Sequence, residues 1–306
     1  LYPTTHGLVE GDDRLVDEAV TLAETLADAS LTPAAFLTSA AAFTERGLEQ
    51  GFEIFATGPE ALDEAAQWIA QNAETDFFLV VEVGSVDPAV VDQGEEAYAQ
   101  QVGVVDQAAQ RVLAAVDAAG LSDRATIAVV SLSGFGLGEH GQASGPSIYS
   151  PETRVPLLLA SPGLAAGQGI DKIVEVIDIG PTLIALAGQE PAAELQGRSL
   201  LELIRGAGTP PYVAFGEAAG GEQGYFAALG GYRLVVRGPD GVSELYELTN
   251  DPAEQNDLAA TEEKRLQVLE DHLSAWKKMV SVASLDPERR TEELDEEALE
   301  QLRSLG

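Results

Sequence analysis

Apolar and polar residues alternate along the first part of the chain with the periods of helices and strands. An apolar position at every third or fourth residue from Leu15 to Leu26 predicts a helix. A turn at residues 31–33 then leads into a short strand over residues 34–37. Residues 61–70 carry a second amphipathic pattern. The chain therefore opens with a helix, a strand and another helix.

A nearly continuous apolar run follows at residues 77–83, typical of a strand buried on both faces of a parallel sheet. Residues 95–119 carry one apolar stripe at helical spacing, and Gly120 provides the stop. A further apolar strand is predicted over residues 126–132. Strand, helix and strand of these lengths indicate a βαβ unit with a right-handed crossover.

In the second half of the chain the predicted elements become shorter, and glycine and proline separate them more often. Residues 155–160 form another apolar run, and Pro181 suits the first turn of a helix over residues 182–187. After the Gly/Pro-rich segment 206–211, short strands separated by glycine turns predict an antiparallel meander backed by a helix over residues 261–280. The predicted strands of this meander are residues 212–215, 225–229, 232–237 and 243–247.

The order of elements predicts an α/β fold with a small antiparallel subdomain. We expect an α/β core over residues 1–208, an antiparallel C-terminal subdomain with one helix over residues 209–285, and an acidic tail over residues 286–306. A chain of 306 residues that is 45% hydrophobic can bury a large core. No apolar run approaches the roughly 18 residues of a membrane-spanning helix.

Charge narrows the possible partners. The chain has 51 acidic and 17 basic residues, a formal net charge of −34. Such a field repels nucleic acid and anionic membrane surfaces, and we exclude both as partners. Two interpretations stay open: a solvated surface suited to solubility or salt, and a docking surface for a basic protein. The absence of cysteine excludes disulfides and thiol chemistry.

The most informative segment is the turn at residues 131–141, which reads Ser-Leu-Ser-Gly-Phe-Gly-Leu-Gly-Glu-His-Gly. It resembles the turn S-D-H-G-E-x-L-G-E-H-G of sulfatases and related enzymes of the alkaline phosphatase superfamily. In that family the Asp and its His or Asn neighbour hold the catalytic metal. Leu132 and Ser133 occupy those places here. Leucine has no lone pair, and a neutral hydroxyl is a poor substitute for a carboxylate or imidazole on a divalent cation.

The resemblance extends along nearly the whole chain, with its parts in the family's order. Residues 1–7 resemble the segment G-x-Y-P-x-x-H-G, and residues 77–79 with 87–88 resemble F-F-L-x-x-H-x-x-D-P-H. The resemblance implies an alkaline-phosphatase-like fold: a mixed, largely parallel sheet between helices, with a small antiparallel C-terminal subdomain. Further similar segments are residues 21–26, 102–106, 149–156, 162–163, 176–182, 197–200, 244–248, 250–254 and 302–306.

The resemblance also implies groups that this chain does not contain. The family's first strand, with its pair of metal-binding aspartates, and the Cys or Ser that becomes the formylglycine nucleophile should precede Leu1. We therefore expect the chain to be part of a longer polypeptide. The histidines around the D-P-H turn are replaced, the first by Glu82 or Gly84 and the second by Ala89. Ser144 stands where the family places a His-Gly pair or a lysine.

These positions predict a vestigial pocket with no catalytic residue and no metal. The histidines that fall in family motifs, His6 and His140, are interpreted as structural residues, because one imidazole does not make a metal site. Glu139 beside His140 suggests a local ion pair. No G-x-S-x-G nucleophile elbow occurs, and turn capping accounts for the carboxylate of Asp178. The predicted pocket comprises Glu82, Asp87, Leu132, Ser133, Glu139, His140 and Ser144.

Together these features favour a catalytically inactive sulfatase-like protein, a structural or interaction subunit of a larger assembly exported to the periplasm or cell surface. It needs no cofactor, and its acidic tail at residues 286–300 is a candidate contact for a basic protein partner. One alternative is a sulfuric- or phosphoric-ester hydrolase completed by a preceding segment, with Glu82, Asp87 or Glu139 binding calcium or another divalent cation. Another is a non-hydrolytic binder of an anionic glycan or ester, for which Arg154 is the nearest cation in sequence.

Overall fold

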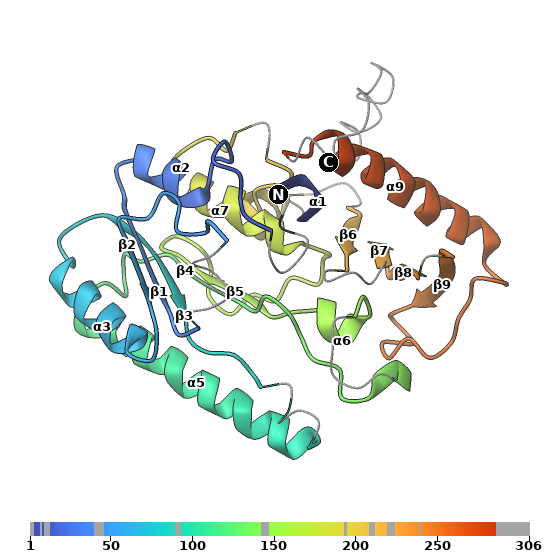
Figure 1. Ribbon diagram of the computed structural model, residues 1–306, viewed down its shortest axis with the longest axis horizontal. Helices are drawn as coiled ribbons and strands as arrows, with labels where there is room; N and C mark the ends of the chain where they lie inside the picture. The colour runs from blue at the N-terminus through green and yellow to red at the C-terminus, as the bar shows by residue number, and fades with distance from the viewer. Residues whose placement is uncertain are drawn as a thin grey trace.

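The computed structural model shows two regions of β-sheet, each with helices packed beside it (Figure 1). Helices α3 and α5 lie along one face of the first region, and α2 and α7 lie on the other (Figure 1). The second region is an antiparallel sheet beside the long helix α9. The structure describes residues 3–6, 8, 13–39, 46–87, 89, 93–141, 147–192, 195–207, 212–218, 224–238 and 240–285.

The first sheet contains three parallel strands in the order β2-β1-β3. These are β1 (Thr32–Leu37), β2 (Ile54–Thr57) and β3 (Phe77–Glu82). In the register, Ala34 lies opposite Ile54 on one side and Leu79 on the other. β1 has a neighbour on both edges, and its residues from Pro33 to Leu37 are buried. The predicted strand at residues 34–37 is confirmed and begins two residues earlier.

The first of the predicted helices, α2 (Leu22–Asp28), is shorter than the apolar spacing predicts. Its start is fixed by a capping box: the Glu24 amide donates to the Thr21 hydroxyl, and the Thr21 amide donates to the Glu24 carboxylate at 2.8 Å. The Glu24 pKa is lowered, chiefly by that amide. Leu15 and Ala19 are buried outside the helix. The apolar spacing extends upstream of the helix because the segment before Thr21 also buries apolar side chains. The cap at Thr21 determines where the helix begins.

The predicted helix at residues 61–70 is present as α3 (Ala61–Gln71), and the long helix as α5 (Glu95–Ala118). Gly120, just after α5, has a φ of +70°, which suits glycine. The next strand, β4 (Ile127–Val130), pairs with β5 (Leu157–Ala160) in antiparallel fashion.

The predicted βαβ unit is wrong in one respect. β3, α5 and β4 follow one another, but β4 belongs to a separate two-stranded sheet with β5 and has no ladder to β3. The prediction that β3 is buried on both faces is also wrong, since all six of its residues are half-buried. β3 is an edge strand of this sheet, with a neighbouring strand on one side. An apolar sequence does not by itself show whether a strand lies at the edge or in the centre of a sheet.

The described part of the chain also contains short elements: α1 (Pro3–His6), α6 (Ser150–Thr153), α7 (Ile179–Leu186), α8 (Leu201–Ile204) and the 3₁₀ turns Glu139–Gly141 and Val176–Asp178. Asp178 is fully buried and caps the turn Val176–Asp178 by accepting the amides of Glu175 and Arg198, both at 2.9 Å. Burial raises the pKa of Asp178, and the two amides oppose the rise. Its predicted capping role is confirmed.

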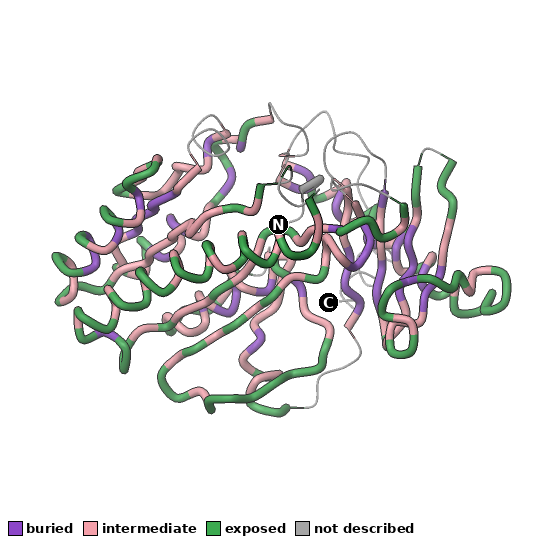
Figure 2. Tube along the Cα trace, turned by 90° about the horizontal axis from the view of Figure 1, so that it is seen from below, coloured by how far each residue is buried: buried purple, intermediate pink, exposed green. Residues whose placement is uncertain are grey.

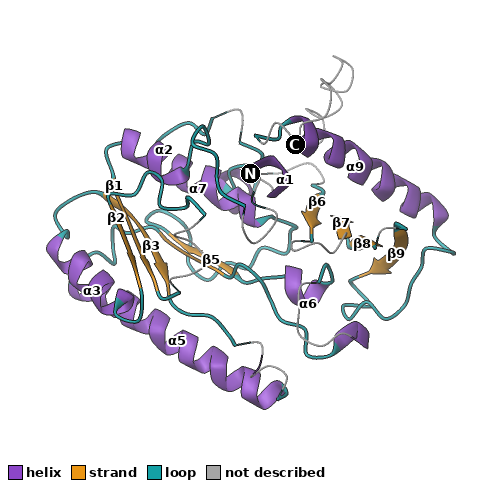
Figure 3. Cartoon of the chain, viewed as in Figure 1, coloured by secondary structure: helices purple, strands orange, loops and turns teal. Residues whose placement is uncertain are grey.

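The C-terminal meander is confirmed (Figure 3). β6 (Ala214–Glu217), β7 (Gly224–Leu229), β8 (Tyr232–Arg237) and β9 (Val242–Glu247) pair in sequence order, and α9 (Glu263–Val282) packs against them. At its core, the rings of Phe215 and Trp276 stack with centroids 5.3 Å apart. These two rings belong to the core between the meander and α9.

Buried residues form two main groups, one in the parallel sheet with α3 and one between the meander and α9 (Figure 2). The N-terminal α1 lies against α9, where the Leu285 amide donates to the Thr5 carbonyl at 2.7 Å. The subdomain boundaries at residues 208 and 285 stay a prediction. The acidic tail, residues 286–306, lies outside the described residues.

Candidate functional site

The turn after β4 presents the two positions where the resemblance predicts lost ligands. Leu132 is 77% exposed, and Ser133 is also exposed. The turn is bonded to α6, because the Gly134 amide donates to the Glu152 carbonyl at 2.7 Å. A Cβ on Gly134 would lie 2.0 Å from the carbonyl oxygen of Pro151 in α6. Glycine is therefore required where the turn meets α6.

The acidic residues predicted at the end of β3 are engaged locally. Glu82 accepts the Ser39 amide at 2.8 Å, the Ser39 hydroxyl at 2.7 Å and the Thr38 hydroxyl at 3.3 Å. Both carboxylate oxygens are thus bonded to the end of β1. Asp87 is exposed and caps the Ala89 amide at 2.9 Å. Ser144 lies outside the described residues.

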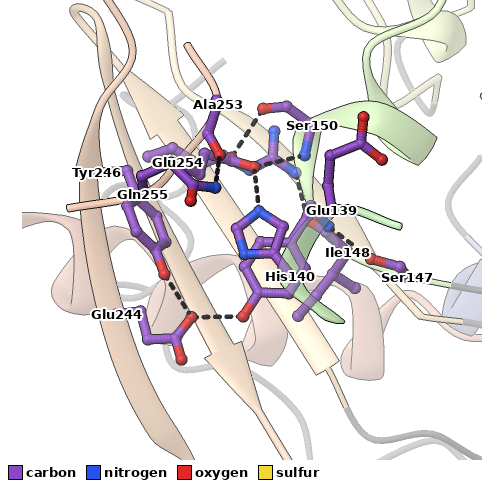
Figure 4. Close-up of polar contacts among 12 residues, drawn as sticks. Glu139, His140, Ser147, Ile148, Ser150, Glu244, Tyr246, Ala253, Glu254 and Gln255 are labelled. Carbon is purple, nitrogen blue, oxygen red and sulfur yellow. Dashed lines mark hydrogen bonds and ion pairs between the residues drawn. The ribbon is translucent and has the colours of Figure 1, made fainter. Parts of the chain in front are cut away.

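His140 connects the turn to the C-terminal subdomain (Figure 4). Its ring stacks on Tyr149 with centroids 3.7 Å apart, and its Nε2 lies 3.6 Å from a carboxylate oxygen of Glu254. The structure therefore pairs His140 with Glu254 and not with the neighbouring Glu139, which accepts the Leu137 amide. The backbone of His140 has a φ of +54°, and this turn presents the ring to the distant subdomain.

Glu254 is the centre of a buried polar cluster (Figure 4). Its Oε1 lies 3.2 Å from Nε of Arg233 and accepts the Ser150 hydroxyl at 2.7 Å, and its Oε2 accepts the Ser150 amide at 2.9 Å. Arg233 also donates to the Ile148 carbonyl at 2.5 Å. Burial lowers the pKa of Arg233 to about 10, and the charge of Glu254 opposes the decrease. A buried ion pair supported this way is costly to break on one side.

A second carboxylate, Glu244, lies beside the first cluster (Figure 4). It accepts the hydroxyls of Tyr149 at 2.6 Å and Tyr246 at 2.9 Å, and Nε of Arg237 at 3.1 Å. Burial alone would raise the pKa of Glu244, but these hydrogen bonds outweigh it and lower the pKa. Burial and the same carboxylate raise the pKa of both tyrosines. Both phenols are therefore fixed as neutral donors.

The described side chains do not fit the divalent metal that the resemblance implies. No group of three or more His, Cys, Asp or Glu side chains among them is arranged to hold a metal ion. Leu132 and Ser133 offer no charged ligand, and both oxygens of Glu82 are hydrogen-bonded to Ser39, just after β1. His140 and Glu254 do bring an imidazole and a carboxylate together. The same carboxylate is paired with Arg233, whose positive charge would repel a metal ion.

Sequence reasoning identified His140 but not its surroundings. Glu254 and Ser150 both lie in segments that resemble the family, whereas Arg233 lies outside them. The available signal was Arg233 itself, a charge within the largely apolar strand β8, where it shares a face with Val235. A charge at such a position needs a buried partner.

Two family models match the chain. The model described as "Sulfatase" matches residues 55–189, and the model described as "N-sulphoglucosamine sulphohydrolase, C-terminal" matches residues 138–279. A protein named "Sulfatase" from Formosa agariphila is 31% identical over 160 residues, which cover 52% of this chain and 31% of that protein. "Arylsulfatase K" from Xenopus laevis is 26% identical over 176 residues, covering 53% and 33%. The chain spans about a third of the length of these relatives.

Solved structures agree on the fold. A putative sulfatase from Bacteroides thetaiotaomicron superimposes with a TM-score of 0.68 at 16% identity, covering 95% of this chain and 83% of that one. A phosphonate monoester hydrolase from Silicibacter pomeroyi superimposes with a TM-score of 0.73 at 14% identity, covering 95% and 88%. The predicted alkaline-phosphatase-like fold is thereby confirmed. The two family models together extend from residue 55 to residue 279, and the chain belongs to the sulfatase family.

Proposed function

We propose that this chain is a sulfatase-family protein without ester-hydrolysing chemistry of its own, and that it acts as an interaction subunit of a larger assembly. The observation that carries the proposal is the turn after β4. It presents an exposed leucine, Leu132, and a serine where the resemblance calls for metal ligands. Sulfuryl and phosphoryl transfer need a cation to stabilise charge on the ester oxygens, and a leucine side chain cannot hold one.

The packing around His140 supports a scaffold role. The ion pair of Arg233 with Glu254 and the stacking of His140 on Tyr149 hold the turn against the subdomain. A fold retained in this way still offers surfaces for binding.

The chemistry of the partner follows from charge. A net charge of −34 favours a basic protein partner, and like-charge repulsion disfavours nucleic acid. We also propose that the protein is exported, because relatives include a protein named "Extracellular sulfatase SULF-1 homolog" from Drosophila melanogaster, 32% identical over 106 residues. In the part of the chain that the structure describes, no helix is both long enough and apolar enough for a membrane span.

The test is hydrolysis by the purified chain of 4-nitrophenyl sulfate and 4-nitrophenyl phosphate, with and without added calcium, manganese or zinc. We expect no saturable turnover above the uncatalysed rate. Saturable turnover that depends on metal, and that Glu82→Gln abolishes, would contradict the proposal and identify Glu82 as an unorthodox ligand.

A second candidate is a hydrolase completed by a segment outside this chain. It is favoured by the names of the relatives, which are sulfatases, and by their length, since this chain spans about a third of it. The anion-binding alternative has less support. Arg154 is exposed, but Arg233 and Arg237 are engaged by Glu254 and Glu244.

A further inference from the structure

A cavity of about 340 Å³ lies between the segment before α2, residues 13–21, and the turn at residues 46–51. Its wall also includes Glu24, in the first turn of α2. Helix α2 lies at one side of the first region, away from the meander and α9 (Figure 1). Ligand pockets of proteins measure about 300–1,000 Å³, so a cavity at the small end of this range suits one side chain or a small molecule.

Hydrogen bonds between the two segments fix the walls of this cavity. Nε2 of Gln50 donates to the Ala19 carbonyl at 2.7 Å, and the Leu15 amide donates to the Arg46 carbonyl at 2.8 Å. Nε of Arg46 donates in turn to the Asp13 carbonyl at 3.2 Å. A ligand therefore meets walls that are already in place, which reduces the entropy lost on binding.

Acidic side chains dominate the lining. Among the described residues that line the cavity, Asp17, Glu24 and Glu49 contribute three carboxylates and Arg14 contributes one guanidinium. Three negative charges against one positive charge leave two negative charges in excess. The amide of Thr21 lowers the pKa of Glu24, so this carboxylate is charged at neutral pH. The cavity therefore attracts a cation.

Glu49 is the carboxylate with the fewest donors around it. Its Oε1 lies 3.4 Å from a terminal nitrogen of Arg14, and the two side chains are 40% and 59% exposed. Such an exposed ion pair contributes little and is readily exchanged. Its Oε2 is enclosed and accepts no hydrogen bond from the described residues. An enclosed acceptor without a donor is costly, and rotation about the terminal torsion of Glu49 can present either oxygen to a ligand.

We infer that this cavity receives an arginine side chain of a basic protein partner. The inference rests on the proposed function, because it names a contact through which the interaction subunit binds that partner. The planar guanidinium presents paired N–H donors that can meet both oxygens of one carboxylate, as Glu49 requires. The incoming arginine displaces Arg14, whose weak contact shows that a guanidinium reaches this carboxylate.

Other cations match the cavity less well. No group of three or more His, Cys, Asp or Glu side chains in the described part of the chain is arranged to hold a metal ion. A lysine ammonium is a strongly hydrated point charge without the paired planar donors of arginine. The lining also contains Leu15 and Gly47, which offer an apolar wall to the aliphatic stem of the incoming side chain.

The test is an NMR titration of the whole chain with arginine that is capped by an N-acetyl and an N-methylamide group, followed through the backbone amides. We expect saturable shifts in residues 14–17 and 47–50, and binding of the equally capped lysine that is roughly tenfold weaker. Shifts that do not saturate, or that spread evenly over the acidic surface, overturn the inference. Tighter binding of free L-arginine also overturns it, because a free amino acid would then be the occupant.

A first pair of variants locates the carboxylate that binds. Glu49→Gln keeps the shape of the side chain but removes its charge, and should weaken binding of the capped arginine roughly tenfold. Glu18→Gln removes the same charge from an exposed carboxylate of the neighbouring segment, outside the lining, and should leave the affinity unchanged. Equal affinities of the two variants would show attraction by the general charge of the surface, and would overturn the inference.

A second pair of variants tests the displacement of Arg14. Arg14→Gln removes the competing guanidinium and should tighten binding by roughly threefold or more. Arg111→Gln is the matched control, since Arg111 is also an exposed arginine paired with a carboxylate, Asp63, but lies on α5. It should leave the affinity unchanged. Binding that is no tighter in Arg14→Gln than in Arg111→Gln overturns the inference.

The docking test and the function test fail separately. Ester hydrolysis by the chain would contradict the non-catalytic function and leave the shifts at residues 14–17 and 47–50 unaffected. Loss of saturable arginine binding would overturn the docking site and leave the absence of hydrolysis standing.

Discussion

At the scale of residues, one buried carboxylate organises the region around the sulfatase-like turn. Glu254 is 2% exposed and is shared by His140, Arg233 and Ser150, which come from three separate segments. An interior ion pair of this kind contributes little net stability compared with apolar packing, but removal of one partner leaves an uncompensated charge. The cluster therefore makes the position of the turn dependent on the C-terminal subdomain.

Glu254→Ala should lower the free energy of unfolding by about 3–5 kcal/mol, because Arg233 would stay buried without its counter-ion. The measurement is urea denaturation followed by tryptophan fluorescence. Glu262→Gln is the control: its ion pair with Arg265 is 3.9 Å long and exposed, and we expect a change below about 0.5 kcal/mol. A loss of less than about 1 kcal/mol for Glu254→Ala would show that the cluster does not hold the turn.

His6 gives a pH dependence of stability. Burial, assisted by the charge of Arg46, lowers its pKa from 6.5 to about 4 in the folded chain. Between these values the unfolded state binds more protons, so stability is complete above pH 6.5 and decreases as the pH falls toward 4. The difference in unfolding free energy amounts to at most about 3.4 kcal/mol. His6→Gln should flatten this part of the stability profile, and a slope equal to that of the wild type would contradict the assignment.

At the scale of elements, the sequence pattern predicted whether a segment is a helix or a strand better than it predicted which strands pair. The long helix α5, the strand β3 and the antiparallel meander were all identified, because their apolar spacing extends over several turns or repeats. The start of α2 was misplaced since Thr21 and Glu24 set it through a cap. The absent ladder between β3 and β4 could not be predicted, because the apolar pattern of a strand does not encode which strand lies next to it.

The turn after β4 depends on close backbone contact with α6. Gly134→Ala would bring a Cβ to 2.0 Å from the Pro151 carbonyl, so the backbone must shift, and we expect a loss of about 1–3 kcal/mol in unfolding free energy. Gly103→Ala is the matched control, with no atom near the added methyl group in α5. It should stabilise the protein by up to about 1 kcal/mol. Similar thermal shifts for both variants would show that the contact with α6 is dispensable.

At the scale of the whole molecule, a sulfatase-family fold is combined with a strong negative charge and a turn without acidic metal ligands. The sequence motif located the turn, with Leu132, Ser133 and His140. It could not place Arg233 beside Glu254, since that contact forms only when β8 and the segment after β9 come together. The non-catalytic interpretation follows from the donor groups that the fold brings to the turn and the contacts they already make.

The most direct test of this interpretation is the metal content of the purified native protein, measured by inductively coupled plasma mass spectrometry after dialysis against calcium, manganese and zinc. The account predicts less than stoichiometric binding of each ion, unchanged in Glu82→Gln. One equivalent of a divalent metal per chain, lost in Glu82→Gln, would contradict it and assign the turn to a working hydrolase.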